Sequence, residues 1–105
     1  MLFVNPTDVE DDGGDQLPGG FELYQNYPNP FNPSTTIAFE LPRVSNVTVE
    51  IYTLLGELVK RADLGRLGAG RHSYDFNAEY LASGIYLYQV KAGEYSAIRK
   101  MALLK

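Results

Sequence analysis

Asn46-Val-Thr-Val-Glu-Ile51 is the stretch of this sequence that decides its fold. Val47, Val49 and Ile51 alternate with polar residues, which is the pattern of a β-strand that buries one face and exposes the other to water. The same alternation precedes this stretch in residues 35–41. An antiparallel sheet is therefore predicted for this part of the chain.

The two-residue period continues along the rest of the chain. Strands are predicted at residues 58–64, 73–77, 85–91 and 95–104, and turns at Gly56, at Gly93 and across Gly65, Gly68 and Gly70. Residues 77–83 tolerate one helical turn, although a single turn is too short to stand alone. Six or seven short strands at intervals of about 8–12 residues predict an all-β fold, an immunoglobulin-like antiparallel β-sandwich of about seven strands.

The composition changes near residue 20. Residues 7–20 are acidic and glycine-rich, with Asp8, Glu10, Asp11, Asp12, Gly13, Gly14, Asp15, Gly19 and Gly20. Such a stretch buries too little apolar surface to fold and is predicted to be a linker. The chain is therefore divided into residues 1–20, an N-terminal segment and linker, and residues 21–105, a folded domain. Leu2-Phe3-Val4 is a short apolar run that could add as a strand to this sheet or to a neighbour's.

Residues 8–13 partly resemble a calcium-binding loop. Oxygen-bearing side chains stand at relative positions 1, 3 and 5 and a glycine at 6, but the acid wanted at position 12 is replaced by Gly19. A solvated acidic linker explains the same residues. We predict no metal site and no cofactor.

Composition excludes several function classes. The chain has 105 residues, no cysteine and a net charge of −4. Disulfides, zinc–thiolate sites and thiol catalysis are therefore excluded, and nothing suggests nucleic-acid binding. No apolar run approaches the roughly 20 residues that span a bilayer. No signal peptide is visible either, so an exported protein would carry it upstream of Met1.

The most distinctive motif is Asn26-Tyr-Pro-Asn-Pro-Phe-Asn-Pro-Ser34. Its prolines disfavour helix, so the segment is predicted to be extended, with Tyr24, Tyr27 and Phe31 pinning it onto a sheet. Together with its flanks, this motif resembles the opening signature of the C-terminal sorting domains of type IX secretion, which also opens the immunoglobulin-like domain of flagellar hook-capping proteins. The matching signature residues are Asn26, Pro28, Asn29, Pro30, Phe31, Asn32, Pro33, Gly56, Gly84 and Tyr86.

The resemblance implies a non-catalytic domain at the C-terminal end of a larger protein that is secreted or held at the cell surface. Its implied partners are the outer-membrane secretion machinery and a sortase-like peptidase, with cleavage in the linker at Gly13, Gly14, Gly19 or Gly20. The final strand carries the recognition signal in this family, and the matching positions are Lys100, Met101, Ala102, Leu103, Leu104 and Lys105. A terminal hairpin at a sheet edge offers unpaired backbone groups to a partner strand, which makes this recognition plausible.

Two other functions remain open from the residues alone. Edge strands could pair between copies, giving a self-associating structural or adhesion subunit. Exposed tyrosines could form a sugar-binding platform from Tyr24, Tyr27, Tyr86, Tyr88 and Tyr95. Arg99, Lys100 and Lys105 could dock an acidic receptor or simply discourage aggregation of the edge.

The sequence contains few residues that could act in catalysis. His72 is the only histidine, and no nucleophile or paired carboxylates stand at a useful spacing from it. A structural histidine beside a turn is the better interpretation. No catalytic residue is predicted.

Overall fold

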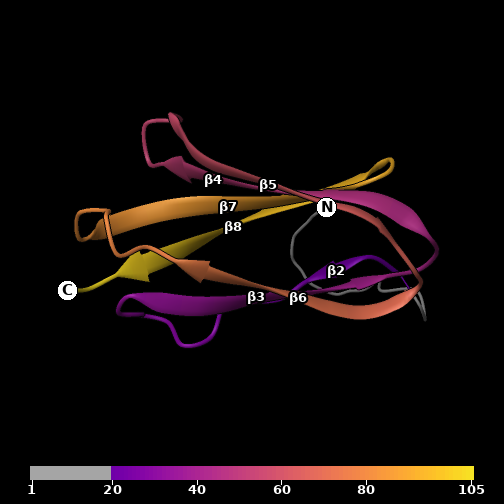
Figure 1. The fold of residues 1–105 in the computed structure, drawn as a ribbon, viewed down its shortest axis with the longest axis horizontal. Helices are drawn as coiled ribbons and strands as arrows, with labels where there is room; N and C mark the ends of the chain where they lie inside the picture. Colours follow the sequence, from indigo (N-terminus) through magenta and orange to yellow (C-terminus); the bar gives the residue numbers. More distant parts are fainter. Residues whose placement is uncertain (1–19) are drawn as a thin grey trace, which may run out of the picture.

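The computed structural model of the chain describes residues 20–105. This part of the chain contains β-strands and no helix (Figure 1). The strands are β2 (Glu22–Leu23), β3 (Ser34–Leu41), β4 (Ser45–Thr53), β5 (Leu58–Leu67), β6 (Gly70–Asn77), β7 (Gly84–Ala92) and β8 (Tyr95–Leu103).

The strands form two antiparallel sheets that pack face to face. One sheet has the order β2-β3-β6 and the other β5-β4-β7-β8. The connections β3–β4, β5–β6 and β6–β7 cross from one sheet to the other, so both layers are built from interleaved parts of the sequence (Figure 1). This arrangement confirms the predicted immunoglobulin-like sandwich.

The alternating apolar residues meet between the two layers. The core between the layers contains four fully buried residues from these two stretches, Ile37 and Phe39 of β3 and Val49 and Ile51 of β4. The inward residues of β7 and β8 complete the core, which includes Leu41, Val47, Phe76, Tyr86, Tyr88, Val90, Met101 and Leu103. Each such side chain stabilises the fold by about 1.5–3 kcal/mol on burial.

The turns at Gly56 and Gly93 are confirmed. Both glycines have positive φ, +96° and +61°, a conformation that side chains disfavour. The prediction for Gly65 was wrong, because this residue lies inside β5, where φ is +75°. There the register with β4 shifts between Val47 and Thr48, and the extra residue forms a bulge.

Residues 77–83, which tolerate a helical turn by composition, form turns and no helix. The side chain of Asn77 accepts a hydrogen bond from the backbone N–H of Glu79 (2.8 Å), and Leu81 N–H donates to Ala78 C=O (3.0 Å). These bonds close turns rather than a helix, because the chain must pass from one sheet to the other within a few residues.

The proline-rich segment bends instead of running extended. The side chain of Asn26 donates to Pro28 C=O (3.1 Å), and the Thr35 hydroxyl donates to the same carbonyl (2.9 Å). This local bonding curves the chain away from a straight strand. Phe31 consequently reaches the core with 2% exposure, as predicted, whereas Tyr27 points to solvent with 81% exposure and does not pin the segment.

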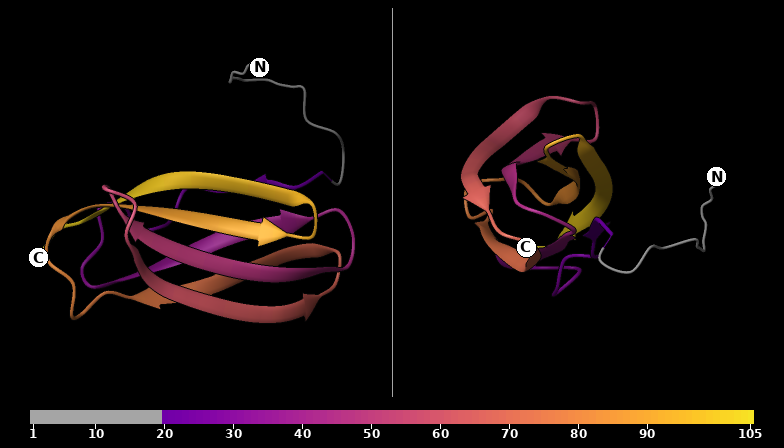
Figure 2. Two further views of the ribbon diagram at one scale, coloured as in Figure 1. Left: turned by 90° about the horizontal axis from the view of Figure 1, so that it is seen from above. Right: turned by 90° about the vertical axis from the view of Figure 1, so that its right-hand side faces the viewer.

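The domain is elongated, measuring 37 × 29 × 22 Å, and the two ends of its described chain lie at opposite poles. Phe21 stacks on Tyr95 at the start of β8, with 5.7 Å between ring centroids. The C-terminus follows the far end of β8 (Figure 2). Phe21 and the last residues of the chain are therefore separated by the length of a nine-residue strand.

Candidate recognition site on the C-terminal strand

β8 occupies one edge of the four-stranded sheet. Nine of its residues pair with β7 without any shift of register, from the pair of Tyr95 with Ala92 to the pair of Leu103 with Gly84. β7 is its only strand partner among the described residues. The predicted edge position of the terminal hairpin is confirmed.

The side chains of the predicted recognition residues divide by the two-residue period. Met101 and Leu103 are fully buried in the core. Lys100 and Leu104 are exposed, as is Lys105, and Ala102 is partly exposed. Of the predicted recognition residues, the folded domain leaves Lys100, Ala102, Leu104 and Lys105 accessible, while Met101 and Leu103 hold the strand in place.

The outer backbone edge of residues 100–104 is already occupied. Residues 25–33, here called the signature segment, lie beside it and form a short parallel bridge between Phe31 and Leu103. Phe31 N–H donates to Ala102 C=O (2.9 Å), and Leu104 N–H donates to Phe31 C=O (3.0 Å). The expectation of unpaired backbone groups is therefore wrong for this half of β8, because the bent segment supplies a substitute for a neighbouring strand.

Two amide side chains of the signature segment also form hydrogen bonds with the outer backbone edge of β8. Asn29 Oδ1 accepts a hydrogen bond from Ala102 N–H (3.0 Å). Gln25 Nε2 donates to Lys100 C=O (2.8 Å) and also to Asn26 Oδ1 (2.7 Å). Lys100 C=O, both backbone groups of Ala102 and Leu104 N–H thus gain partners without a further strand, which limits edge-to-edge pairing there.

A buried tyrosine fixes the start of the signature segment to the opposite sheet. The Tyr88 hydroxyl donates to Tyr24 C=O (2.8 Å) and accepts from Asn26 N–H (2.8 Å). Asn26 Nδ2 in turn donates to Thr35 Oγ1 (3.0 Å). Burial raises the pKa of Tyr88, so the hydroxyl keeps its proton and remains a donor.

The end of the chain is tied to the loop before β7. Lys105 N–H donates to Ser83 Oγ (2.9 Å), and the Lys105 ammonium donates to Glu79 C=O. The same loop is held by the Tyr86 hydroxyl, which donates to Ala82 C=O (2.7 Å). A tyrosine at the start of this strand that bonds back to the preceding loop is the tyrosine corner of immunoglobulin-like domains. Tyr86 therefore has a structural role beneath the recognition residues.

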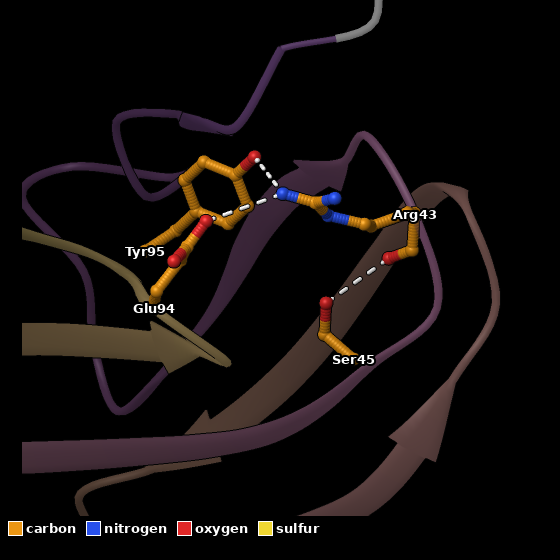
Figure 3. A network of polar contacts seen from close by, with 4 residues as sticks. All are labelled: Arg43, Ser45, Glu94 and Tyr95. Atoms are coloured by element: carbon orange, nitrogen blue, oxygen red, sulfur yellow. Dashed lines mark hydrogen bonds and ion pairs between the residues drawn. The ribbon is translucent and has the colours of Figure 1, made fainter.

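The opposite pole, where the chain arrives, is held by polar contacts shown in Figure 3. The Arg43 guanidinium lies 3.2 Å from the Glu94 carboxylate and donates to the Tyr95 hydroxyl (3.0 Å). Ser45 Oγ donates to the Arg43 carbonyl (3.1 Å). The Arg43 and Glu94 side chains are exposed, so their ion pair contributes little stability, whereas Ser45 is buried. They position the ring of Tyr95 on which Phe21 stacks.

The tyrosines predicted for a sugar platform do not share one surface. Tyr86 and Tyr88 are buried and use their hydroxyls within the fold. Tyr24 donates to Glu40 (2.9 Å) beneath the Arg71 guanidinium, and Tyr95 is covered by Phe21. Because only Tyr27 is freely exposed, the five rings cannot form the expected platform.

His72 lies beside a turn, as the sequence predicted. Its Nε2 atom is 2.7 Å from Gly68 C=O, so Nε2 carries the proton and donates. The ring packs against Phe39, with 5.9 Å between centroids. Within residues 20–105, no three potential metal-binding side chains gather. No helix of this region is long and apolar enough to cross a membrane.

Several predictions fall on residues outside the described range. These are the strand at residues 2–4, the calcium loop at residues 8–13 and the cleavage positions Gly13, Gly14 and Gly19. Gly20 is the first described residue and is only partly buried.

The sequence reasoning missed the partners that hold the C-terminal strand. Gln25 and Asn29 are polar residues placed among prolines and aromatics, which is a signal that their amides satisfy specific backbone groups. Ser83, three residues before Tyr86, binds the last residue in the same way. Their partners lie more than 20 residues away in sequence and were not predictable from local pattern.

Comparison with known families agrees with this geometry. The family model for the secretion system C-terminal sorting domain matches residues 25–103, more than half of the chain. The match begins at Gln25 and ends at the last residue of β8, so it contains both the signature segment and the strand it covers. No curated protein matches the chain.

Proposed function

This chain belongs to the family of secretion system C-terminal sorting domains, and from that premise we propose that its folded domain directs an upstream cargo protein to the cell surface by presenting the outer side chains of its last strand. Membership makes it a C-terminal sorting signal for type IX secretion, in a protein that is secreted or displayed at the cell surface. The surface that the secretion machinery contacts is, in this proposal, formed by those outer side chains of β8.

The observation that carries the proposal is the closed outer edge of β8. The backbone of residues 100–104 is bonded to Gln25, Asn29 and Phe31, so it has little left to offer a partner strand. We infer that the machinery contacts the exposed side chains of Lys100, Leu104 and Lys105. Two cations beside a leucine suit an acidic partner surface with an apolar contact at its centre.

The separation of the two poles supports this proposal. The cargo would join the domain at Phe21, far from Leu104 and Lys105. A partner bound at the C-terminal pole would therefore not meet the cargo. A sortase-like peptidase would then cut upstream of Phe21, in the linker that contains Gly13, Gly14, Gly19 and Gly20, and leave the domain behind.

A surface-export assay tests this proposal. A secreted reporter is fused upstream of residues 1–105 in a type IX-competent bacterium, and surface reporter is measured for Leu104→Asp and Lys105→Glu. Val44→Asp is the matched control, because Val44 is exposed to a similar degree (47%, against 59% for Leu104) but lies in the β3–β4 turn at the far pole. Export should fall at least tenfold for both C-terminal variants, about 1.4 kcal/mol of lost recognition, and stay unchanged for the control.

Point variants are preferable to truncation here. Removing residues 100–105 would also remove Met101 and Leu103 from the core and unfold the domain. Each variant's Tm shows that the domain is still folded. Normal export of a folded Leu104→Asp, Lys105→Glu double variant would contradict the proposed surface.

A further inference from the structure

The outer side of β8 has a second half that the signature segment does not reach. In this strand, the N–H and C=O of even-numbered residues point away from β7, as the contacts of Lys100, Ala102 and Leu104 show. The backbone groups of Ser96 and Ile98 point to the same side. Within residues 20–105, none of these four groups has a hydrogen-bond partner.

The edge on the other side of the same sheet is protected differently. β5 contains two shifts of register against β4 and carries exposed charges at Lys60, Arg61 and Arg66. Bulges and charges of this kind keep other strands from pairing. β8 has no shift along its whole length, and the residue at the centre of its open half is Ile98, an apolar side chain with 53% exposure. The open half of β8 is thus the edge of this sheet suited to accept a strand.

A groove runs beside this open half. It has a volume of about 280 Å³ and is lined by Phe21, Glu22, Leu23, Ala97, Ile98 and Arg99. This is below the roughly 300–1,000 Å³ of pockets that enclose small molecules, and it suits one or two side chains of an extended peptide. Phe21 and Leu23 make one wall apolar next to Ala97.

Positive charge marks the other part of the groove. Arg99 lines the groove, and its Nε–H donates to Leu23 C=O (2.7 Å), which leaves the donors of the terminal guanidinium nitrogens for another partner. Lys100 follows on the outer face of the strand. Neither cation forms an ion pair with any of the described carboxylates. Glu22 lines the opposite wall, so an incoming carboxylate is favoured on the Arg99 side only.

We propose that residues 96–100 of β8 bind an extended peptide that adds as a further strand and carries an apolar residue and a carboxylate two positions apart. The apolar side chain lies over Ala97 against Leu23, and the carboxylate pairs with Arg99. The spacing follows from the period of a strand, in which alternate side chains share a face. This binding does not depend on the sorting function, because its contacts are to Leu23, Ala97 and Arg99, and the two sites share only Lys100.

Fluorescence anisotropy with a labelled synthetic peptide tests this site on the full chain. The peptide Thr-Glu-Thr-Val-Thr-Glu-Thr presents the required pair in either strand direction, and Thr-Lys-Thr-Val-Thr-Lys-Thr is its charge-reversed control. The glutamate peptide should bind about 2- to 5-fold more tightly than a neutral threonine version, the effect of one partly exposed ion pair. The lysine peptide should bind more weakly than the neutral one. Equal binding of all three, or no binding, would overturn the proposal.

Two variants of Ile98 distinguish the contribution of its backbone N–H to peptide binding from the contribution of its side chain. Ile98→Pro removes the outward N–H without removing a bond to β7, because that N–H points away from the ladder, and proline is tolerated at such edge positions. It should weaken peptide binding at least about fivefold, the effect of one lost hydrogen bond. Ile98→Thr keeps the N–H and should bind nearly as well as the parent chain. Equal weakening by both variants would rule out strand addition.

A measurement on the unaltered chain keeps the test decisive if Ile98→Pro does not fold. In ¹⁵N NMR spectra, the glutamate peptide should shift the amides of Ser96 and Ile98 and leave those of β5 unmoved. If those two amides are instead protected from exchange without peptide, the edge is filled by the chain itself or by a second copy. Light scattering at two concentrations then identifies which, and either result overturns the proposal.

Discussion

Replacing Tyr88 by phenylalanine removes a single oxygen atom from the centre of the domain. The ring of Tyr88 is fully buried and stays in place in this variant, so the core loses almost no volume. What is lost is the pair of hydrogen bonds from the hydroxyl to Tyr24 C=O and from Asn26 N–H, each 2.8 Å long. Asn26 is 2% exposed, and water therefore cannot replace the hydroxyl.

The size of the effect follows from these two contacts. A buried polar group left without its partner costs about 1–3 kcal/mol, so losing both bonds should destabilise the domain by about 2–6 kcal/mol. In a domain of this size, 2 kcal/mol lowers Tm by at least about 8 °C. Unfolding in urea, followed by circular dichroism because the chain has no tryptophan, gives the free energy of unfolding directly.

The matched control is Tyr80→Phe. Tyr80 is 95% exposed, and its hydroxyl makes no hydrogen bond within residues 20–105, so its removal should change stability by no more than about 0.5 kcal/mol. If Tyr88→Phe were as stable as Tyr80→Phe, the buried hydroxyl would not be what fastens the signature segment to the opposite sheet. That result would refute the structural reasoning for the start of the segment.

Two further predictions concern buried polar groups elsewhere. The pKa of Glu50 is lowered from its ordinary 4.5, first by the hydrogen bond from Tyr52 and then by the one from Lys91. The stability that Glu50 contributes is therefore present above pH 4.5 and is lost as the pH falls through the lower folded-state pKa. Glu50→Gln should cost about 1.5–3 kcal/mol at neutral pH. In a plot of unfolding free energy against pH, the variant should also lose less stability than the parent chain as the pH falls. A parallel acid limb in both proteins would contradict this account. Thr35→Val keeps the shape of the side chain but removes the hydroxyl that joins Asn26 to Pro28. Calorimetry should therefore show that the variant is less stable by about 1–3 kcal/mol. Equal stability of the two proteins would show that this hydroxyl is dispensable.

Much of the fold was predictable from local pattern. Residues 35–41 and 46–51 show an uninterrupted two-residue period, and the strands there bury the expected residues. Glycines with positive φ at Gly56 and Gly93 fixed those turns, because few other residues adopt that conformation. The bulge at Gly65 was missed because glycine marks both turns and bulges, and only the pairing of β5 with β4 separates the two.

The candidate site was predictable only in part. The edge position of the last strand followed from chain order, and Lys100, Leu104 and Lys105 are exposed as a partner would require. The cover over its backbone was not foreseen, because it depends on hydrogen bonds between residues separated by more than 70 positions. The proline-rich motif was predicted to be extended, and its bend follows from side-chain bonds of Asn26 and Thr35 that only the folded chain assembles.

Amide hydrogen exchange along β8 tests most directly whether the signature segment closes the outer edge of the C-terminal strand. The amides of Ala102 and Leu104 point outward but are bonded to Asn29 and Phe31, whereas the outward amide of Ile98 has no partner among the described residues. We predict slow exchange at Ala102 and Leu104 and fast exchange at Ile98. Exchange at Ala102 and Leu104 as fast as at Ile98 would show that the edge is open and would contradict the account.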